Sequence, residues 1–167
     1  MSNLKGLHHF CAMNNPSGLI KIEYAPINDI DTNSFEEIRS SSNNWQYNIL
    51  FLQGGWLKAN ILPTRRLWRE TQSRNKQGKY YNQMVRAIVP NLIPDASGEL
   101  DRMADHRFIL KIEDIAGRPW ILGTLNQPFE FTVDGTTGEN GSLKHHTINF
   151  KSKSLRKAAG FVPLFNI

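Results

Sequence analysis

Histidines are the residues of this chain most suited to binding a metal ion, because a neutral imidazole is a common ligand of transition metals. The sequence contains five, and four of them form the adjacent pairs His8–His9 and His145–His146. Adjacent residues of a strand point to opposite faces of a sheet, so neither pair is expected to chelate one ion. We therefore predict no metal site.

Neighbouring carboxylates are the next candidates, since two acids held together can act as acid and base in catalysis. Glu113 and Asp114 are adjacent, but they end a predicted strand beside a turn, where Asp is a common turn former. The sequence has no phosphate-binding glycine loop, dinucleotide fingerprint, nucleophile elbow or zinc-protease helix. We predict a protein that is not an enzyme and takes no cofactor, although a site assembled from distant residues stays open.

Positive charge is concentrated in one segment of the chain. Residues 65–79 contain six cations and one acid, Glu70, so the segment carries 6 − 1 = +5, equal to the net charge of the whole chain. A second run, Lys144 to Lys157, has five cations and no acid. Exposed cations attract polyanions or acidic protein surfaces, and the alternative is a solvated loop without a partner. The six cations are Arg65, Arg66, Arg69, Arg74, Lys76 and Lys79.

The strands that would carry these charges are predicted from period-two alternation of apolar residues. In the segment 107–114, Phe108, Leu110 and Ile112 share one face, and a further strand begins at Trp120 after turn signals. Other strands are expected at 19–24, 47–52, 56–62, 80–89, 129–133 and 144–151. In the first of these, Ile20 should share a face with Ile22 and Tyr24. Gly54 and Gly55 suggest a tight turn between the strands 47–52 and 56–62.

Helical signals are few. The best candidate runs from Ser97, as the N-cap, to about His106, with acids in its first turn and a short apolar stripe. Together with the strands, this predicts a mainly β fold, either a β-sandwich or a barrel, with one short helix and a long projecting arm.

The arm is the basic segment itself. If the strands 56–62 and 80–89 pair, residues 64–79 project between them, because a long segment without its own core rarely stays compact inside a domain. Trp68 in this arm is expected either to stack on a partner or to fold back on the domain. Deletion of Arg65 to Lys76 is expected to leave the fold intact and to abolish assembly.

The chain of 167 residues, with 40% hydrophobic residues, is long enough for one ordinary domain. We expect a flexible or docking arm at 1–18, a single β-rich domain at 19–160 and an apolar tail at 161–167. The tail residues Phe161, Leu164 and Phe165 should pack on the domain or on a neighbour.

Signals of export and membrane insertion are weak in this sequence. No apolar run approaches the length that spans a bilayer, and the polar residues near the start interrupt any secretory apolar segment. The lone Cys11 cannot form an intrachain disulfide. We expect a protein made in a cytoplasm, without a membrane span.

One layout runs through residues 56–150. It comprises the arm 64–79 between strands, the helix 97–106, and the run from Phe108 to Asp114 that continues through Gly117 to Trp120-Ile121-Leu122-Gly123, with Pro128 following. This layout resembles the tail-tube family of bacteriophage structural proteins. The resemblance implies a β-sandwich or barrel that forms rings with its own copies and whose arm reaches a neighbouring subunit or ring. Such tubes present an acidic lumen, whereas this chain is basic, so an acidic partner for the arm, or a different tail, neck or baseplate role, is also open.

Two functional hypotheses follow. The first is a virion structural subunit that assembles with copies of itself and other virion proteins through the basic arm and apolar termini. The second is a nucleic-acid-binding β-barrel whose cations follow the phosphates. The residues expected to meet a partner are Arg65, Arg66, Trp68, Arg69, Arg74, Lys76, Lys79, Phe161, Leu164 and Phe165.

Overall fold

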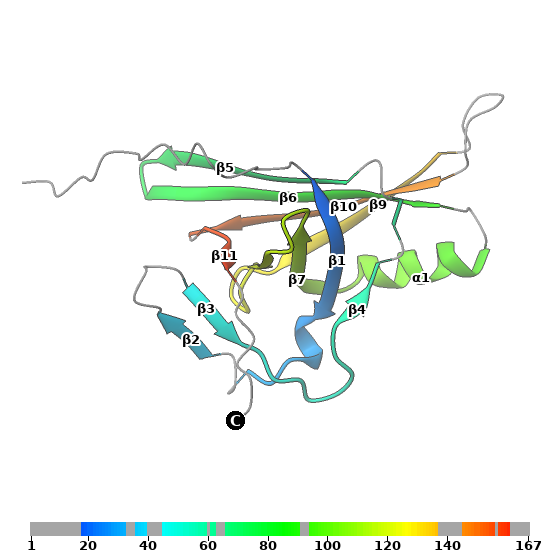
Figure 1. Cartoon of the computed structure of the whole chain (residues 1–167). Coiled ribbons are helices and arrows are strands. Elements are labelled where there is room, and N and C mark those ends of the chain that lie inside the picture. The colour runs from blue at the N-terminus through cyan, green and yellow to red at the C-terminus, as the bar shows by residue number, and fades with distance from the viewer. Residues whose placement is uncertain are drawn as a thin grey trace, which may run out of the picture.

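A computed structural model describes residues 18–32, 36–39, 45–59, 61–62, 66–90, 94–136, 145–155 and 157–160, and every structural statement below concerns these residues. Nine strands form one continuous sheet that folds into two layers (Figure 1). The strands at the two ends of its path, β5 (Leu67–Asn75) and β11 (Ala159–Gly160), do not pair with each other. The predicted mainly β, sandwich-like fold is confirmed, and the barrel alternative is wrong.

The larger layer has the order β9, β10, β6, β5. Its other strands are β9 (Phe129–Thr136), β10 (His145–Ser154) and β6 (Gly78–Pro90). β6 pairs with β5 from Asn75↔Gly78 to Leu67↔Arg86, and with β10 from Ser154↔Tyr81 to His145↔Pro90. β6 therefore holds the basic β5 against the body of the domain.

The smaller layer has the order β4, β1, β7, β8, β11. These strands are β4 (Leu57–Lys58), β1 (Leu19–Pro26), β7 (Arg107–Asp114), β8 (Pro119–Leu122) and the β11 already defined. One edge of β7 pairs with β1 from Pro26↔Phe108 to Leu19↔Asp114. Its other edge pairs first with β9, through Arg107 and Phe108, and then with β8 from Leu110 onward. β7 is thus the strand that joins the two layers.

Aromatic side chains fill the space between the layers. Phe108 lies at the centre, with ring centroids 5.5 Å from Tyr24, 5.8 Å from Phe150 and 6.2 Å from Phe131. Phe108 and Phe129 are fully buried, as the alternating pattern predicts for inward positions. Burial of these rings, together with aliphatic residues such as Ile22, Leu110 and Ile148, stabilises the contact between the layers.

A second, smaller core covers the opposite face of β1, β7 and β8. Its buried members are Ala25, Ile30, Ile109 and Ile121. The chain between β1 and β4 packs over them and contains the 3-10 helix η1 (Ile27–Asp29) and a separate hairpin of β2 (Glu36–Arg39) and β3 (Trp45–Asn48). The smaller layer is therefore covered on both faces.

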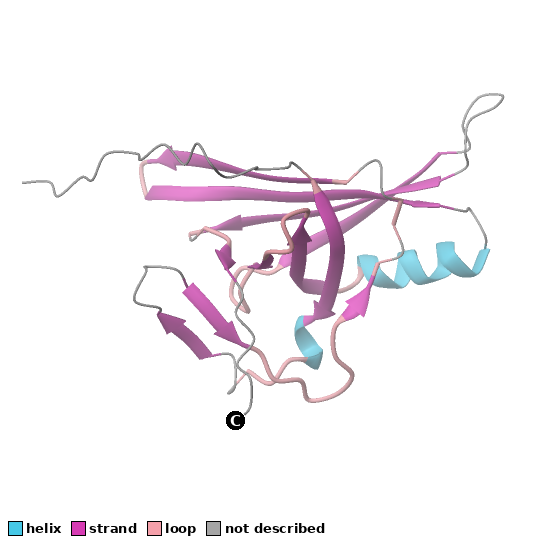
Figure 2. Ribbon diagram, viewed as in Figure 1, coloured by secondary structure: helices cyan, strands magenta, loops and turns pink. Residues whose placement is uncertain are grey.

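The helix α1 (Pro94–Ala104) lies at one end of the layers, as the ribbon in Figure 2 shows. From residue 97 onward, Leu100 and Met103 are the buried residues of the helix, and they join the main core. The predicted helix is confirmed, but it starts at Pro94, so Ser97 is inside it rather than at its N-cap. Proline is favourable in the first turn because its missing N–H has no intrahelical partner there.

Three local predictions around β4 are wrong. The strand expected at 47–52 is replaced by β3, which ends at Asn48, and the strand expected at 56–62 is reduced to Leu57–Lys58. The two do not form a hairpin around Gly54 and Gly55, because β3 pairs with β2 and β4 pairs with β1. Apolar residues of this region pack on the second core in irregular chain. The alternation of apolar residues in the sequence does not by itself distinguish such irregular chain from a strand.

The start of β1 also departs from simple alternation. The register with β7 shifts between Leu19 and Lys21, so Leu19 is buried in the main core and Ile20 is 48% exposed. The predicted inward position of Ile20 is therefore wrong, whereas those of Ile22 and Tyr24 are confirmed. An extra residue in one strand of a pair shifts the alternation, so the residues before it point to the opposite face of the sheet from the one that the pattern predicts.

Gly123 links β8 to the following loop at a tight approach to the core. Its φ is +86°, and an added Cβ would lie 3.0 Å from Cδ2 of Phe129. Gly123→Ala should lower the free energy of unfolding by about 2 kcal/mol, from backbone strain and overpacking together. In Gly98→Ala within α1, the new Cβ meets no atom within 4 Å. The free energy of unfolding of this control, measured in urea, should rise by about 0.5–1 kcal/mol. Equal changes for the two substitutions would contradict the tight packing assigned to Gly123.

Candidate functional site

The basic segment forms the edge strand β5 and the turn that follows it. The strands 56–62 and 80–89 do not pair as expected; instead residues 67–75 pair with β6 along their whole length. Because the pairing of β6 with β10 ends at Tyr81, only the hairpin tip around residues 73–80 extends beyond the body of the sheet (Figure 1). At this tip Arg74, Lys76 and Lys79 are exposed.

Alternation on β5 divides the predicted contact residues between two faces. Trp68 and Glu70 face the inside of the sandwich, and Arg69 and Thr71 face outward. Among the residues expected to meet a partner, Arg69 lies on the outward face, whereas Arg74 and Lys79 share the face of Trp68 but are exposed with Lys76 at the tip, beyond the body of the sheet. Arg65, Phe161, Leu164 and Phe165 lie outside the described residues, as do the expected tail 161–167 and all but Gly18 of the expected N-terminal arm.

Trp68 folds back on the domain, the second of its two expected positions. Its ring centroid is 5.6 Å from that of Trp120, so it links the two layers at the β5 end. Its Nε1 is buried and has no hydrogen-bond partner among the described residues. Deletion of Arg65 to Lys76 would remove this contact and β5 itself, and so would destabilise the fold rather than leave it intact.

Arg66 has a structural role instead of an exposed one. Its Nε donates to the carbonyl oxygen of Leu62 at 2.9 Å, and its Nη1 donates to the carbonyl oxygens of Leu19, at 3.0 Å, and Ile20. These bonds tie the segment before β5 to the start of β1. A guanidinium satisfied in this way is not free to bind a partner.

Glu70, the one acid of the basic segment, is used internally. Its Oε2 accepts hydrogen bonds from Gln83 Nε2 at 2.9 Å and from the backbone N–H of Ala158 at 2.7 Å. It therefore anchors the residues before β11 to β5. The net charge of the segment, +5, includes the negative charge of Glu70. Because Glu70 faces inward, it does not neutralise the cations that face outward.

A hollow of about 740 Å³ opens over β5, β6, β10 and the loop before β9. Cross-strand pairing places Arg69, Met84, Lys151 and Glu130 in one outward row over it, and Thr71, Asn82 and Lys153 in the next. Glu130 is ion-paired with Arg107 at 2.5 Å. Residues 126–128 form the remaining wall. Sequence reasoning singled out the run 144–157 but missed that Lys151 and Lys153 lie beside Arg69.

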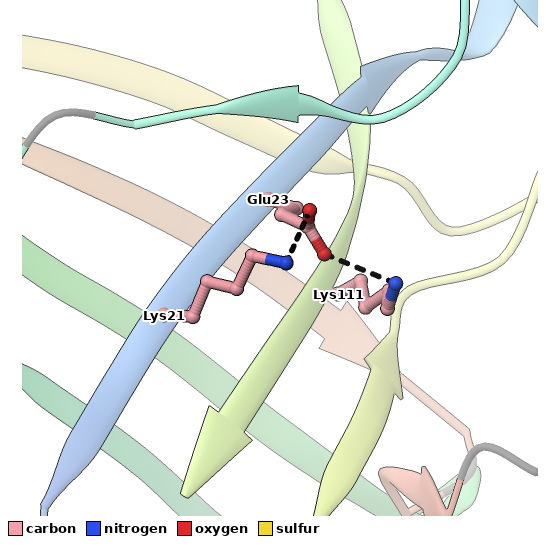
Figure 3. Close-up of polar contacts among 3 residues, drawn as sticks. All are labelled: Lys21, Glu23 and Lys111. Atoms are coloured by element: carbon pink, nitrogen blue, oxygen red, sulfur yellow. Dashed lines mark ion pairs between the residues drawn. The ribbon is translucent and has the colours of Figure 1, made fainter.

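The charged triad Lys21, Glu23 and Lys111 lies on the other layer, on adjacent strands β1 and β7 (Figure 3). The Nζ atoms of Lys21 and Lys111 lie 2.7 and 3.0 Å from the Glu23 carboxylate, which is almost fully buried. Burial alone would raise the pKa of Glu23, but hydrogen bonds and charge attraction from both lysines outweigh it and hold that pKa below its ordinary value. A carboxylate with a lowered pKa is a poor proton acceptor at neutral pH, so the triad is a stabilising ion cluster.

His146 is buried under α1, where its Nε2 lies 3.3 Å from the hydroxyl of Ser97. Its Nδ1 has no hydrogen-bond partner in the described structure. Across the described ranges, no three His, Cys, Asp or Glu side chains gather as a metal ion would require.

β5 presents an unpaired backbone edge nine residues long among the residues that the structure describes. The strands at the other margins of the sheet, β4 and β11, have only two residues each. The two-residue turn Lys76–Gln77 makes Asn75 and Gly78 a hydrogen-bonded pair of the hairpin. Hydrogen-bonded and non-hydrogen-bonded pairs alternate along an antiparallel ladder. The backbone N–H and C=O groups of Arg74, Gln72 and Glu70 therefore point away from β6. Such an edge is a template for a further strand.

Comparison with known proteins gives no match, whether to a family model, to a curated protein or to a solved structure. As for membranes, the helices within the described part of the chain all fall short of the length and apolarity needed to cross one.

Proposed function

We propose that this chain is a non-enzymatic structural subunit of a bacteriophage virion, a tail, neck or baseplate component that assembles with copies of itself and other virion proteins. The proposal rests on the edge of β5 that no strand among the described residues pairs with. Soluble proteins usually shorten, cover or bulge their edge strands, because unpaired N–H and C=O groups recruit further strands. A regular edge of nine residues in the larger layer is explained if another chain pairs with it.

The charges on this hairpin favour a selective partner. Arg69 on the strand and Arg74 and Lys76 at the tip are exposed, and no ion-pair partner of theirs lies within the described chain. Cations on an edge strand oppose pairing with an identical edge and favour an acidic neighbour. We therefore expect a head-to-tail contact with a different, acidic surface of the next subunit, which builds rings or filaments. Two parts of the tail-tube-like layout, the helix α1 and the run from β7 to β8, are present and support the same assignment, whereas the arm between strands 56–62 and 80–89 is not.

Gln72→Pro tests the edge directly. Gln72 directs its N–H to the free side of β5, so proline there spares the ladder with β6 and blocks an added strand. The variant should stay folded but lose assembly, whereas Gln72→Val, which keeps the N–H, should assemble as the wild type does. Light scattering after size exclusion, with electron microscopy of the wild-type particles, measures this. A wild type that is monomeric at all concentrations would contradict self-assembly, and full assembly of Gln72→Pro would exclude β5 as the interface.

A further inference from the structure

Three cations converge on the 740 Å³ hollow without a counter-charge. Arg69, Lys151 and Lys153 are exposed, and no carboxylate of the described chain pairs with them. The single acid in the lining, Glu130, is already neutralised by Arg107. Exposed like charges at this separation repel one another only weakly in water, but all three would attract an anion that lies among them.

The spacing of these cations suits a polymer of anionic units. Lys151 and Lys153 lie two residues apart on β10, or about 7 Å, and Arg69 lies two strands from Lys151, or about 10 Å. Lys153 also lines an adjoining hollow of about 340 Å³ towards the hairpin tip, whereas the ammonium of Lys79 lies over the ring of Tyr81 on the other face of β6. The three cations of the outward face by themselves span more than a single small ligand would cover.

The neutral lining offers both hydrogen-bond donors and acceptors. Asn82, Asn126 and Gln127 contribute amide groups. The wall containing Gln127 is fixed, because its backbone oxygen accepts from the Ser152 hydroxyl at 3.1 Å and its Oε1 accepts from the N–H of Leu155 at 2.9 Å. Tyr80, in the adjoining hollow, adds a half-buried aromatic ring. Mixed amide groups and an aromatic ring match the edges and faces of nucleobases.

We propose that this hollow is a binding site for single-stranded nucleic acid, with the phosphates on Arg69, Lys151 and Lys153 and the bases towards the amides and Tyr80. An acidic polypeptide fits the surface less well, because its carboxylates would contact the cations but not the amide groups or Tyr80. Its backbone would pair with the β5 edge instead. Arg69 is shared with the proposed assembly surface, but Lys151 and Lys153 are not, and neither is part of the β5 edge. Substitution of these two lysines therefore separates nucleic-acid binding from assembly.

The test uses the full chain and a fluorescent oligothymidylate of about 20 nucleotides, with anisotropy measured over a series of salt concentrations. The double variant Lys151→Gln/Lys153→Gln should bind about tenfold more weakly or worse. Its plot of log affinity against log salt should lose about 1.4 in slope, or about 0.7 for each phosphate contact removed. The matched control, Lys58→Gln/Arg118→Gln, removes the same charge from exposed positions on the smaller layer and should bind as the wild type does.

Three results would overturn the inference. The first is that the wild type does not bind the oligonucleotide at low salt. The second is that both double variants weaken binding equally, which would mean that only net charge matters. The third is that polyglutamate displaces the oligonucleotide at equal charge concentration, which would mean that the surface binds an acidic protein. Selective loss in the hollow variant, together with resistance to polyglutamate, supports the site.

Discussion

Phe108→Ala should lower the free energy of unfolding by about 4 kcal/mol, in the range measured for deleting a buried phenyl ring. Phe108 is 1% exposed and lies where β7 passes from one layer to the other, against the rings of Tyr24, Phe131 and Phe150. Its neighbours belong to strands paired on both sides, so they cannot move far to fill the cavity. Urea unfolding followed by tryptophan fluorescence would measure the loss.

Two substitutions serve as controls for this result. Phe108→Leu retains most of the volume and should lose less, about 1.5 kcal/mol. Leu155→Ala removes a side chain that is 67% exposed and should change stability by less than about 0.5 kcal/mol. A Phe108→Ala variant no less stable than Leu155→Ala would show that the aromatic cluster is not the centre of the core.

Glu23→Gln should destabilise the protein by about 2 kcal/mol at pH 7, because it leaves two ammonium groups facing an uncharged, buried amide. The value is set below that for a fully buried pair, since the side chains of Lys21 and Lys111 are 37% and 24% exposed. Their charges can regain part of their hydration when the carboxylate is lost.

The pH dependence of this difference gives a second readout. The pKa of Glu23 is lowered by folding, so its contribution is complete above its ordinary value of 4.5 and is lost as the pH falls through the lower folded-state pKa. The difference between wild type and Glu23→Gln should therefore be constant at neutral pH and shrink in acid. Thermal unfolding of both proteins over a pH series would measure it, and a difference that grows in acid would contradict the ion cluster.

Regular alternation made much of this fold predictable. β7, β9 and β10 appear where Phe108, Phe131 and Phe150 mark a face on the main core, although the other face of β7 is also buried, through Ile109 in the second core. The region from residue 45 to 62 was not predictable, since Ile49, Phe51 and Trp56 pack on the second core and Ala59 and Ile61 on the main core, mostly as irregular chain outside the short strands β3 and β4. The bulge that exposes Ile20 depends on the register with β7, which no local pattern specifies.

The candidate site was predictable in charge but not in arrangement. The count of cations in 65–79 identified Arg69 and the hairpin tip, yet it also included Arg66, whose guanidinium is used on backbone carbonyls. Alternation along this segment would have placed Trp68 and Glu70 on one face and Arg69 on the other, without showing which face is inward. The contribution of Lys151 and Lys153 comes from the pairing of β6 with β10, and strands this far apart in sequence acquire that relation only in the folded sheet.

The division of β7 between β9 and β8 has a mechanical consequence. A pull on β5 passes through consecutive hydrogen-bonded ladders to β6, β10 and β9, and then reaches β7, from which it spreads into β1 and β8. The ladder between β7 and β9 is only two residue pairs long, Arg107↔Glu130 and Phe108↔Phe129. Separation of the two layers under tension would therefore be opposed mainly by exposure of the rings packed around Phe108, not by hydrogen bonds between strands.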